Sequence, residues 1–203
     1  MKLKNLTNWV LIIIGISGII FFSVLFFIGE NDKTQKVIYV QPTAIIKNIV
    51  AIVKPTSGLP IRLIIPKINV DAPFEYVGIT PLGAMDVPKL PADVGWFNLG
   101  PRPGDNGSAV VAGHFGWKNN IPAVFDNLSK LQIGDEVNVI DEKGATSTFI
   151  VREIGTYGSK GDAANVFGSN DNKAHLNLIT CEGTWNATLK SYSNRLVIFT
   201  DKE

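Results

Sequence analysis

Twenty consecutive residues near the start of the chain, from Trp9 to Ile28, carry no charge. As an α-helix rising ~1.5 Å per residue, this run is ~30 Å long and matches the hydrocarbon core of a bilayer. Lys2 and Lys4 precede it. The positive-inside rule therefore places residues 1–8 in the cytoplasm and everything after the run outside the cell membrane.

Two other interpretations of residues 9–28 are a buried helix and a cleaved signal peptide. Twenty uncharged residues at a chain terminus are long for a buried core helix. A signal peptide usually has an apolar segment of ~7–15 residues followed by a small-residue cleavage site, and this chain has a longer segment without such a site. We therefore expect a single-pass anchor that stays attached to an extracellular domain.

The rest of the chain divides into a stem and a folded domain. Residues 29–60 contain Pro42, Pro55 and Pro60 and a linker-like Thr-Ser-Gly triplet, which predicts a stem. Residues 61–203 are expected to form the domain, because 45% of the whole chain is apolar and only 18% is charged.

The charge and the cysteine count exclude several classes of function. Lys and Arg number 19 against 18 Asp and Glu, so the chain is not a nucleic-acid binder that works by bulk charge. One cysteine excludes an intrachain disulfide framework and a Cys-rich zinc module. Two histidines leave little material for a metal site, so we expect no metal.

The domain reads as mainly β. Short runs rich in Val, Ile, Thr and Phe are separated by turn signals, and residues 141–144 between two of them predict a hairpin. Only residues 122–131 show helical spacing. Many strands with one helix suggest an antiparallel barrel or sandwich. The predicted strands are 62–66, 108–114, 136–140, 146–154, 175–180 and 195–200.

The single cysteine is the main candidate for chemistry. Cys181 follows the predicted strand 175–180 and precedes Gly183, which predicts a position where a strand meets a loop. A free cysteine is often a small buried hydrophobe, whereas an unpaired thiol in an exported protein is also typical of a nucleophile. The residue alone leaves both interpretations open.

A nucleophilic thiol needs a base or a cation, because a free thiol titrates near ~8.5. His175 is six residues earlier in the same predicted strand as Cys181, so it lies ~20 Å away and is expected to be a solvated or packed strand residue. His114 ends another predicted strand in a Gly-His-x-Gly sequence, where the backbone bends easily. His114 is therefore the candidate base.

One arginine is a candidate for holding negative charge. Arg195 opens the apolar run 195–200 and alternates there with Val197 and Phe199 on one face. An arginine entering a buried strand costs free energy unless it has a partner, and an acyl transfer needs a group that stabilises developing negative charge. The alternative is a solvated strand end with a surface ion pair.

Together these motifs resemble those of the sortases, membrane-anchored cysteine transpeptidases of Gram-positive-type cell envelopes. Residues 177–181, Asn-Leu-Ile-Thr-Cys, are similar to the family's Thr-Leu-x-Thr-Cys signature, with Asn177 in place of the first threonine. Residues 91–97, 100–104 and 107–114 are similar to the stretch that leads to the catalytic histidine in class E and class F sortases. The resemblance covers the chain from about residue 61 to its end.

The resemblance implies a closed eight-stranded β-barrel with one or two short helices. It also implies that Cys181, as a thiolate, attacks the threonine carbonyl of an LPXTG-like sorting signal and forms a thioester. His114 would exchange a proton with the leaving and incoming amines, Arg195 would hold the substrate backbone or the oxyanion, and Thr180 would help to shape that site.

The partners that the resemblance implies are sorting-signal-bearing surface proteins and an amine of cell-wall peptide or of another protein, with no cofactor. Three alternatives stay open. A cysteine peptidase would use water as the acceptor. An L,D-transpeptidase is expected to carry a Ser-His-Gly-Cys-x-Arg-like cluster, which is absent around Cys181. A non-catalytic anchored β-domain would bind a partner and keep the thiol buried.

Overall fold

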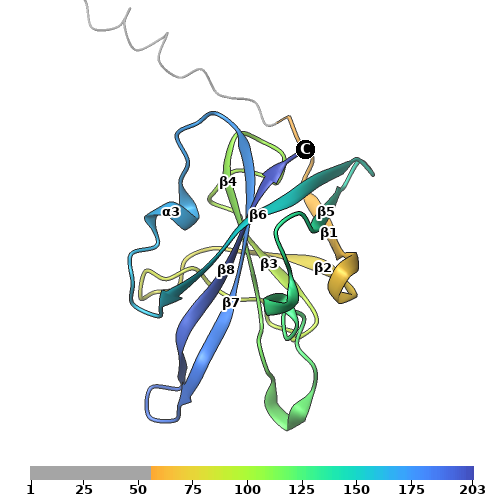
Figure 1. Cartoon of the computed structure of the whole chain (residues 1–203). Coiled ribbons are helices and arrows are strands. Elements are labelled where there is room, and N and C mark those ends of the chain that lie inside the picture. Colours follow the sequence, from red (N-terminus) through yellow and green to blue (C-terminus); the bar gives the residue numbers. More distant parts are fainter. Residues whose placement is uncertain (1–55) are drawn as a thin grey trace, which may run out of the picture. The chain divides into compact units, whose positions relative to one another are not determined.

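The computed structural model describes residues 56–203 (Figure 1). The anchor predicted at 9–28 and nearly all of the predicted stem lie outside these residues. Across 56–203, no helix is both long and apolar enough to cross a membrane.

Eight strands form one closed barrel, in the order β1-β2-β3-β4-β7-β8-β6-β5. This confirms the predicted mainly-β barrel. The strands are β1 (Pro60–Ile65), β2 (Val70–Val77), β3 (Val94–Phe97), β4 (Gly107–Gly113), β5 (Glu136–Asp141), β6 (Thr146–Gly158), β7 (Ala174–Asn186) and β8 (Ser191–Lys202).

Helical structure within residues 56–203 is limited to short pieces. They are one four-residue α-helix, α3 (Ala164–Phe167), and three 3-10 turns, η1 (Pro66–Ile68), η2 (Lys118–Asn120) and η3 (Leu128–Lys130). Figure 1 shows α3 on the connection between β6 and β7. The barrel is therefore held together by strand pairing and by its apolar interior.

Side chains alternate between the two faces of the barrel wall, because successive residues of a strand point to opposite sides. Leu176 and Leu178 of β7 belong to the interior core, and both are fully buried. Asn177, Ile179 and Cys181 therefore belong to the opposite face. There a second apolar cluster forms, which contains Val110, Val166, Val197 and Phe199, with Ile179 packed against it.

Two strand pairs are parallel, β2 with β3 and β4 with β7, and the remaining pairs are antiparallel. The hairpin predicted at residues 141–144 joins β5 to β6 and is confirmed. Its Asp141 carboxylate accepts N–H groups of Lys143 and Ala145, at 2.9 Å each, and one from Gly58. Burial alone would raise the pKa of Asp141, but these hydrogen bonds outweigh it and lower the pKa.

The helix predicted at residues 122–131 is wrong. The segment forms turns and only the single 3-10 turn η3. Its backbone groups bind elsewhere: Phe125 donates its N–H to the His114 carbonyl at 3.0 Å, and the Asp126 carboxylate accepts N–H groups from Gly116 and Ala123. The apolar spacing instead serves to bury Phe125 beneath the end of β4.

Candidate active site

The predicted site residues lie on or directly after three neighbouring strands, β4, β7 and β8 (Figure 1). His114 directly follows the last residue of β4. Cys181 of β7 lies directly opposite Arg195 of β8. In the parallel pair, Ala112 lies beside Ile179, so the same register continued two residues past that pair brings His114 beside Cys181. Adjacent strands are ~4.8 Å apart, so the three residues form a row across one face of the barrel.

Cys181 does not end its strand, which corrects the expectation from the sequence. β7 continues to Asn186, but its pairing with β8 shifts between Glu182 and Trp185, and Gly183 has a φ of 84°. A glycine adopts this left-handed conformation without strain, so the bulge re-aims the chain just after the cysteine. The thiol is free and half-buried, so it is not sealed inside the core.

Thr180 points to the other face of the wall from Cys181, because neighbouring residues of a strand alternate. Its side chain is 4% exposed, and its hydroxyl donates to the Gly113 carbonyl at 2.8 Å. This bond ties β7 to β4 one residue before the row on both strands. Thr180 thus fixes the register that sets Cys181 beside His114.

The imidazole of His114 is held by two neighbours. Its Nε2 lies 2.7 Å from the carbonyl oxygen of Pro88, and its ring meets Trp117 edge-on with centroids 4.5 Å apart. A carbonyl oxygen only accepts, so Nε2 must carry a hydrogen. Among residues 56–203, no hydrogen bond occupies the second ring nitrogen, Nδ1.

Arg195 is anchored by carbonyls of its own strand, near the start of β8. Its Nη1 donates to the carbonyls of Asn194 at 2.8 Å and of Tyr192 at 3.2 Å. Among residues 56–203, no carboxylate forms an ion pair with Arg195, which is half-buried. The register places this guanidinium-bearing residue directly opposite Cys181.

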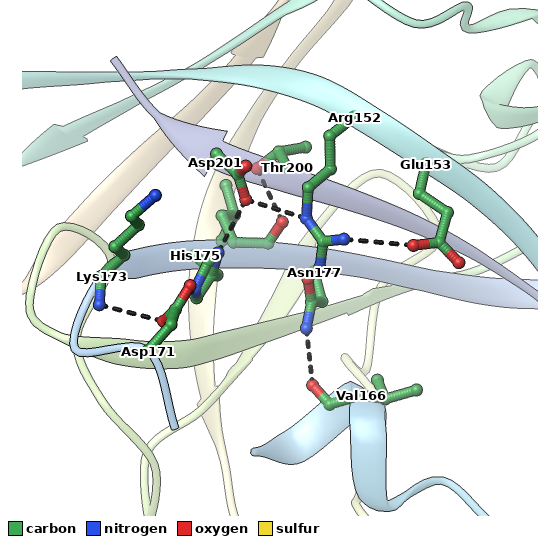
Figure 2. Close-up of polar contacts among 10 residues, drawn as sticks. Arg152, Glu153, Val166, Asp171, Lys173, His175, Asn177, Thr200 and Asp201 are labelled. Carbon is green, nitrogen blue, oxygen red and sulfur yellow. Dashed lines mark hydrogen bonds and ion pairs between the residues drawn. The ribbon is translucent and has the colours of Figure 1, made fainter. Parts of the chain in front are cut away.

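His175 takes no part in this row, as expected, and Figure 2 shows it between Asp171 and Asp201. It is 5% exposed, and its Nδ1 and Nε2 lie 2.7 Å and 2.9 Å from Asp201 and Asp171. Arg152 pairs with the same Asp201 at 2.8 Å. The hydrogen bond from His175 is the main cause that lowers the pKa of Asp171. His175 is a packed strand residue that joins the start of β7 to the end of β8.

The second apolar cluster adjoins the row on the same face of the barrel wall. Ile179, which precedes the row on β7, packs against this cluster, and the cluster includes Val197, which follows the row on β8, together with Val166 of α3. Asn177 holds this helix in place, because its Nδ2 donates to the Val166 carbonyl at 2.7 Å (Figure 2). The sequence analysis missed α3 and Pro88, since nothing in the local pattern links either of them to the row.

The arrangement provides a thiol, an imidazole and a guanidinium in one row, which are the groups for an acyl transfer through a thioester. Across residues 56–203, no three His, Cys, Asp or Glu side chains are grouped to hold a metal ion.

Comparisons with known proteins agree with this arrangement. A family model, the sortase domain, matches residues 63–203. Among solved structures, the chain is similar to sortase C-1 from Actinomyces oris, with 26% identity, a TM-score of 0.56, and coverage of 70% of this chain and 72% of that one. It is similar to sortase A from Corynebacterium diphtheriae, with 23% identity, a TM-score of 0.56, and coverage of 72% and 61%.

Sortase C1 from Streptococcus agalactiae is similar too, at 24% identity and a TM-score of 0.56, with coverage of 70% of this chain and 66% of that one. In the comparison with curated proteins, nothing matches. The family model nevertheless spans more than half of the chain and includes every strand that carries the row. The chain therefore belongs to the sortase family of cysteine transpeptidases.

Proposed function

We propose that this protein is a membrane-anchored sortase that cleaves an LPXTG-like sorting signal after threonine and transfers the product to an amine. The observation that supports the proposal is the row formed by Cys181 on β7, Arg195 on β8 and His114 directly after β4. Strands of a closed barrel hold such a row rigidly, because each is paired on both sides.

In the first step, the Cys181 thiolate attacks the threonine carbonyl of the sorting signal. A carbon–sulfur bond forms, the peptide carbon–nitrogen bond breaks, and His114 donates a proton to the leaving amine. The oxyanion that develops lies next to the guanidinium of Arg195, which stabilises it. The product of this step is a thioester between Cys181 and the substrate.

In the second step, an amine attacks the thioester carbon. His114 takes the proton that the amine loses, a new amide bond forms, and Cys181 leaves as a thiolate. Because Cys181 is only half-buried, an incoming amine reaches the thioester without disassembly of the barrel. Cell-wall peptide or another surface protein supplies the amine in this proposal.

The predicted anchor at residues 9–28 gives this reaction its place. Sorting-signal-bearing proteins and wall precursors are held at the outer face of the cell membrane, and tethering the enzyme there raises the effective concentration of each. We propose that the domain works on that outer face, with residues 1–8 in the cytoplasm.

The test uses the full chain in detergent with a fluorescent LPXTG peptide, with and without a glycine-based amine. Mass spectrometry should find the thioester on wild-type protein and no adduct on Cys181→Ala. Arg195→Ala should lower turnover by ~10²–10³-fold, the usual loss for one oxyanion donor. Arg152→Ala removes an equal charge remote from the row and should leave turnover unchanged.

Two outcomes would contradict the proposal. Cleavage without any amine-linked product identifies a cysteine peptidase that uses water as its acceptor. No labelling of Cys181 by a thiol reagent under native conditions favours a non-catalytic binding domain instead.

A further inference from the structure

We propose that Glu75 is a positioning residue for His114 and acts through the peptide group that joins Pro88 to Lys89. The inference rests on the proposed function, because it assigns the group that orients the acid–base imidazole. Glu75 lies on β2, and Pro88 and Lys89 belong to the connection between β2 and β3.

The contacts form an uninterrupted chain of hydrogen bonds. One carboxylate oxygen of Glu75, Oε1, accepts the N–H of Lys89 at 2.7 Å and that of Leu90 at 3.4 Å. The carbonyl of the same Pro88–Lys89 peptide lies 2.7 Å from Nε2 of His114. A single planar peptide group therefore binds a carboxylate at one end and the imidazole at the other.

The geometry of a trans peptide gives this arrangement its effect. The N–H and C=O bonds of such a group point in opposite directions, and none of the described peptide bonds is cis. An oxygen acceptor on the N–H fixes the orientation of the amide, polarises it and makes its carbonyl oxygen a stronger acceptor. The Glu75 oxygen thereby holds the Pro88 carbonyl on the Nε2–H of His114.

The relaying peptide is also held in place by packing. Pro88 has a fixed φ, and it lies so close to Gly95 of β3 that a Cβ atom there would be 3.1 Å from the proline Cδ. Asp86, two residues earlier, donates its N–H to the Gly78 carbonyl at 3.0 Å. The carbonyl that meets His114 is thus positioned from both sides of the connection.

The consequence for the reaction is that each ring nitrogen of His114 has a different role. Nε2 keeps its hydrogen, which it donates to the Pro88 carbonyl. Nδ1 is therefore the nitrogen that exchanges a proton with the leaving and incoming amines. Without the relay, the imidazole rotates more freely and both tautomers become populated. Both changes lower the fraction of His114 that is ready to transfer a proton.

The experiment uses full-length protein in detergent with ¹⁵N-labelled histidine. The chain has two histidines, so the spectrum contains His114 and, as an internal reference, the remote His175. Wild type should show His114 with hydrogen fixed on Nε2. Glu75→Ala should average the two nitrogen shifts of His114 and lower kcat by about 10–100-fold, part of the usual general acid–base contribution.

Two variants separate positioning from a merely structural role. Glu75→Gln keeps an oxygen acceptor at the same place, so it should restore the tautomer signature and most of the turnover. Glu142→Ala is a matched control, because Glu142 likewise accepts a backbone N–H, from Leu59 at 3.2 Å, and should leave His114 unchanged. Melting temperatures verify that each variant is folded.

Unchanged nitrogen shifts of His114 in folded Glu75→Ala would overturn the inference, as would a failure of Glu75→Gln to restore them. If Glu75→Ala does not fold, Lys89→Pro removes the same N–H while it keeps the Pro88 carbonyl, and its His114 shifts decide the question. The spectrum is read without substrate, so it tests the relay even if wild type cleaves no sorting peptide, which would refute only the proposed function.

Discussion

Replacing Gly113 by alanine should both destabilise the domain and lower turnover, because it displaces His114 from the row with Cys181 and Arg195. A Cβ atom on Gly113 would lie 2.6 Å from Cε2 of Phe125 and would overlap its Cδ2. Real Cβ contacts do not fall below 3.0 Å, so the ring or the strand end must move. Phe125 is fully buried and has no free space to enter, so the added methyl overpacks the core.

The expected cost follows from this overlap. One extra methyl in a well-packed core costs about 1–3 kcal/mol. For a domain of about 150 residues, a loss of about 2 kcal/mol lowers the melting temperature by roughly 4–8 °C. Gly113 directly precedes His114, whose carbonyl accepts the Phe125 N–H. A displacement of the imidazole by about 1 Å should lower turnover by up to ~10²-fold.

The assay is thermal unfolding of the full chain together with cleavage of a sorting peptide. Gly158→Ala is the matched control, because an added Cβ there meets nothing within 4 Å, and its stability should change by less than about 0.5 kcal/mol. Phe125→Leu replaces the ring that the new methyl group meets with a smaller side chain. In the double variant, the destabilisation should fall below the sum of the two single changes by about 1 kcal/mol.

Strict additivity of the two changes would refute the steric account. A melting temperature of Gly113→Ala equal to that of wild type would refute it as well, because the overlap would then be relieved without cost.

Three further outcomes are expected. Thr180→Val removes the hydroxyl that binds the Gly113 carbonyl and should cost about 1 kcal/mol in chemical unfolding, with lower turnover because the β4–β7 register loosens. Burial, and then the charge of Glu75, raise the pKa of Asp93 in the folded protein. The folded state therefore binds this proton more tightly than the unfolded state, and the free energy of unfolding falls as pH rises above about 4. Asp93→Asn should remove this fall, which is measured from melting temperatures at pH 4 and pH 7. Phe149→Ala empties a fully buried core position and should cost about 3–5 kcal/mol in denaturant titration.

The sequence by itself determined the mainly-β class and most of the strands. Alternation of apolar and polar residues is a local property, and it places side chains on the two faces of a strand whatever that strand pairs with. The runs at 136–140 and 146–154 therefore fall within β5 and β6, with the predicted hairpin between them. Turn chemistry at Asp141 is local in the same sense, because its carboxylate binds N–H groups two and four residues later.

The strands that the sequence did not indicate lack such a local pattern. β2 contains Asp71, Pro73 and Glu75, and β3 has only four residues. Both strands exist because neighbouring strands of the barrel pair with them, and pairing is a tertiary property. The helix predicted at 122–131 is wrong for the opposite reason. Its apolar residues do have helical spacing, but the N–H groups of Val124 and Phe125 bind the carbonyls of Pro91 and His114, which are distant in the sequence.

The candidate residues could be selected from the sequence, but their proximity in space could not be predicted from it. Cys181, His114 and Arg195 stand out by rarity and by their place at strand ends or beside glycines, and family motifs added their order. Only parallel pairing of β4 with β7 brings His114 beside Cys181, across 67 residues of chain. Pro88 contacts His114 through its backbone carbonyl, and Glu75 contacts the backbone N–H of Lys89. Nearly every residue has such backbone groups, so the residue types in the sequence do not indicate these contacts. Only the tertiary structure decides which backbone groups come together.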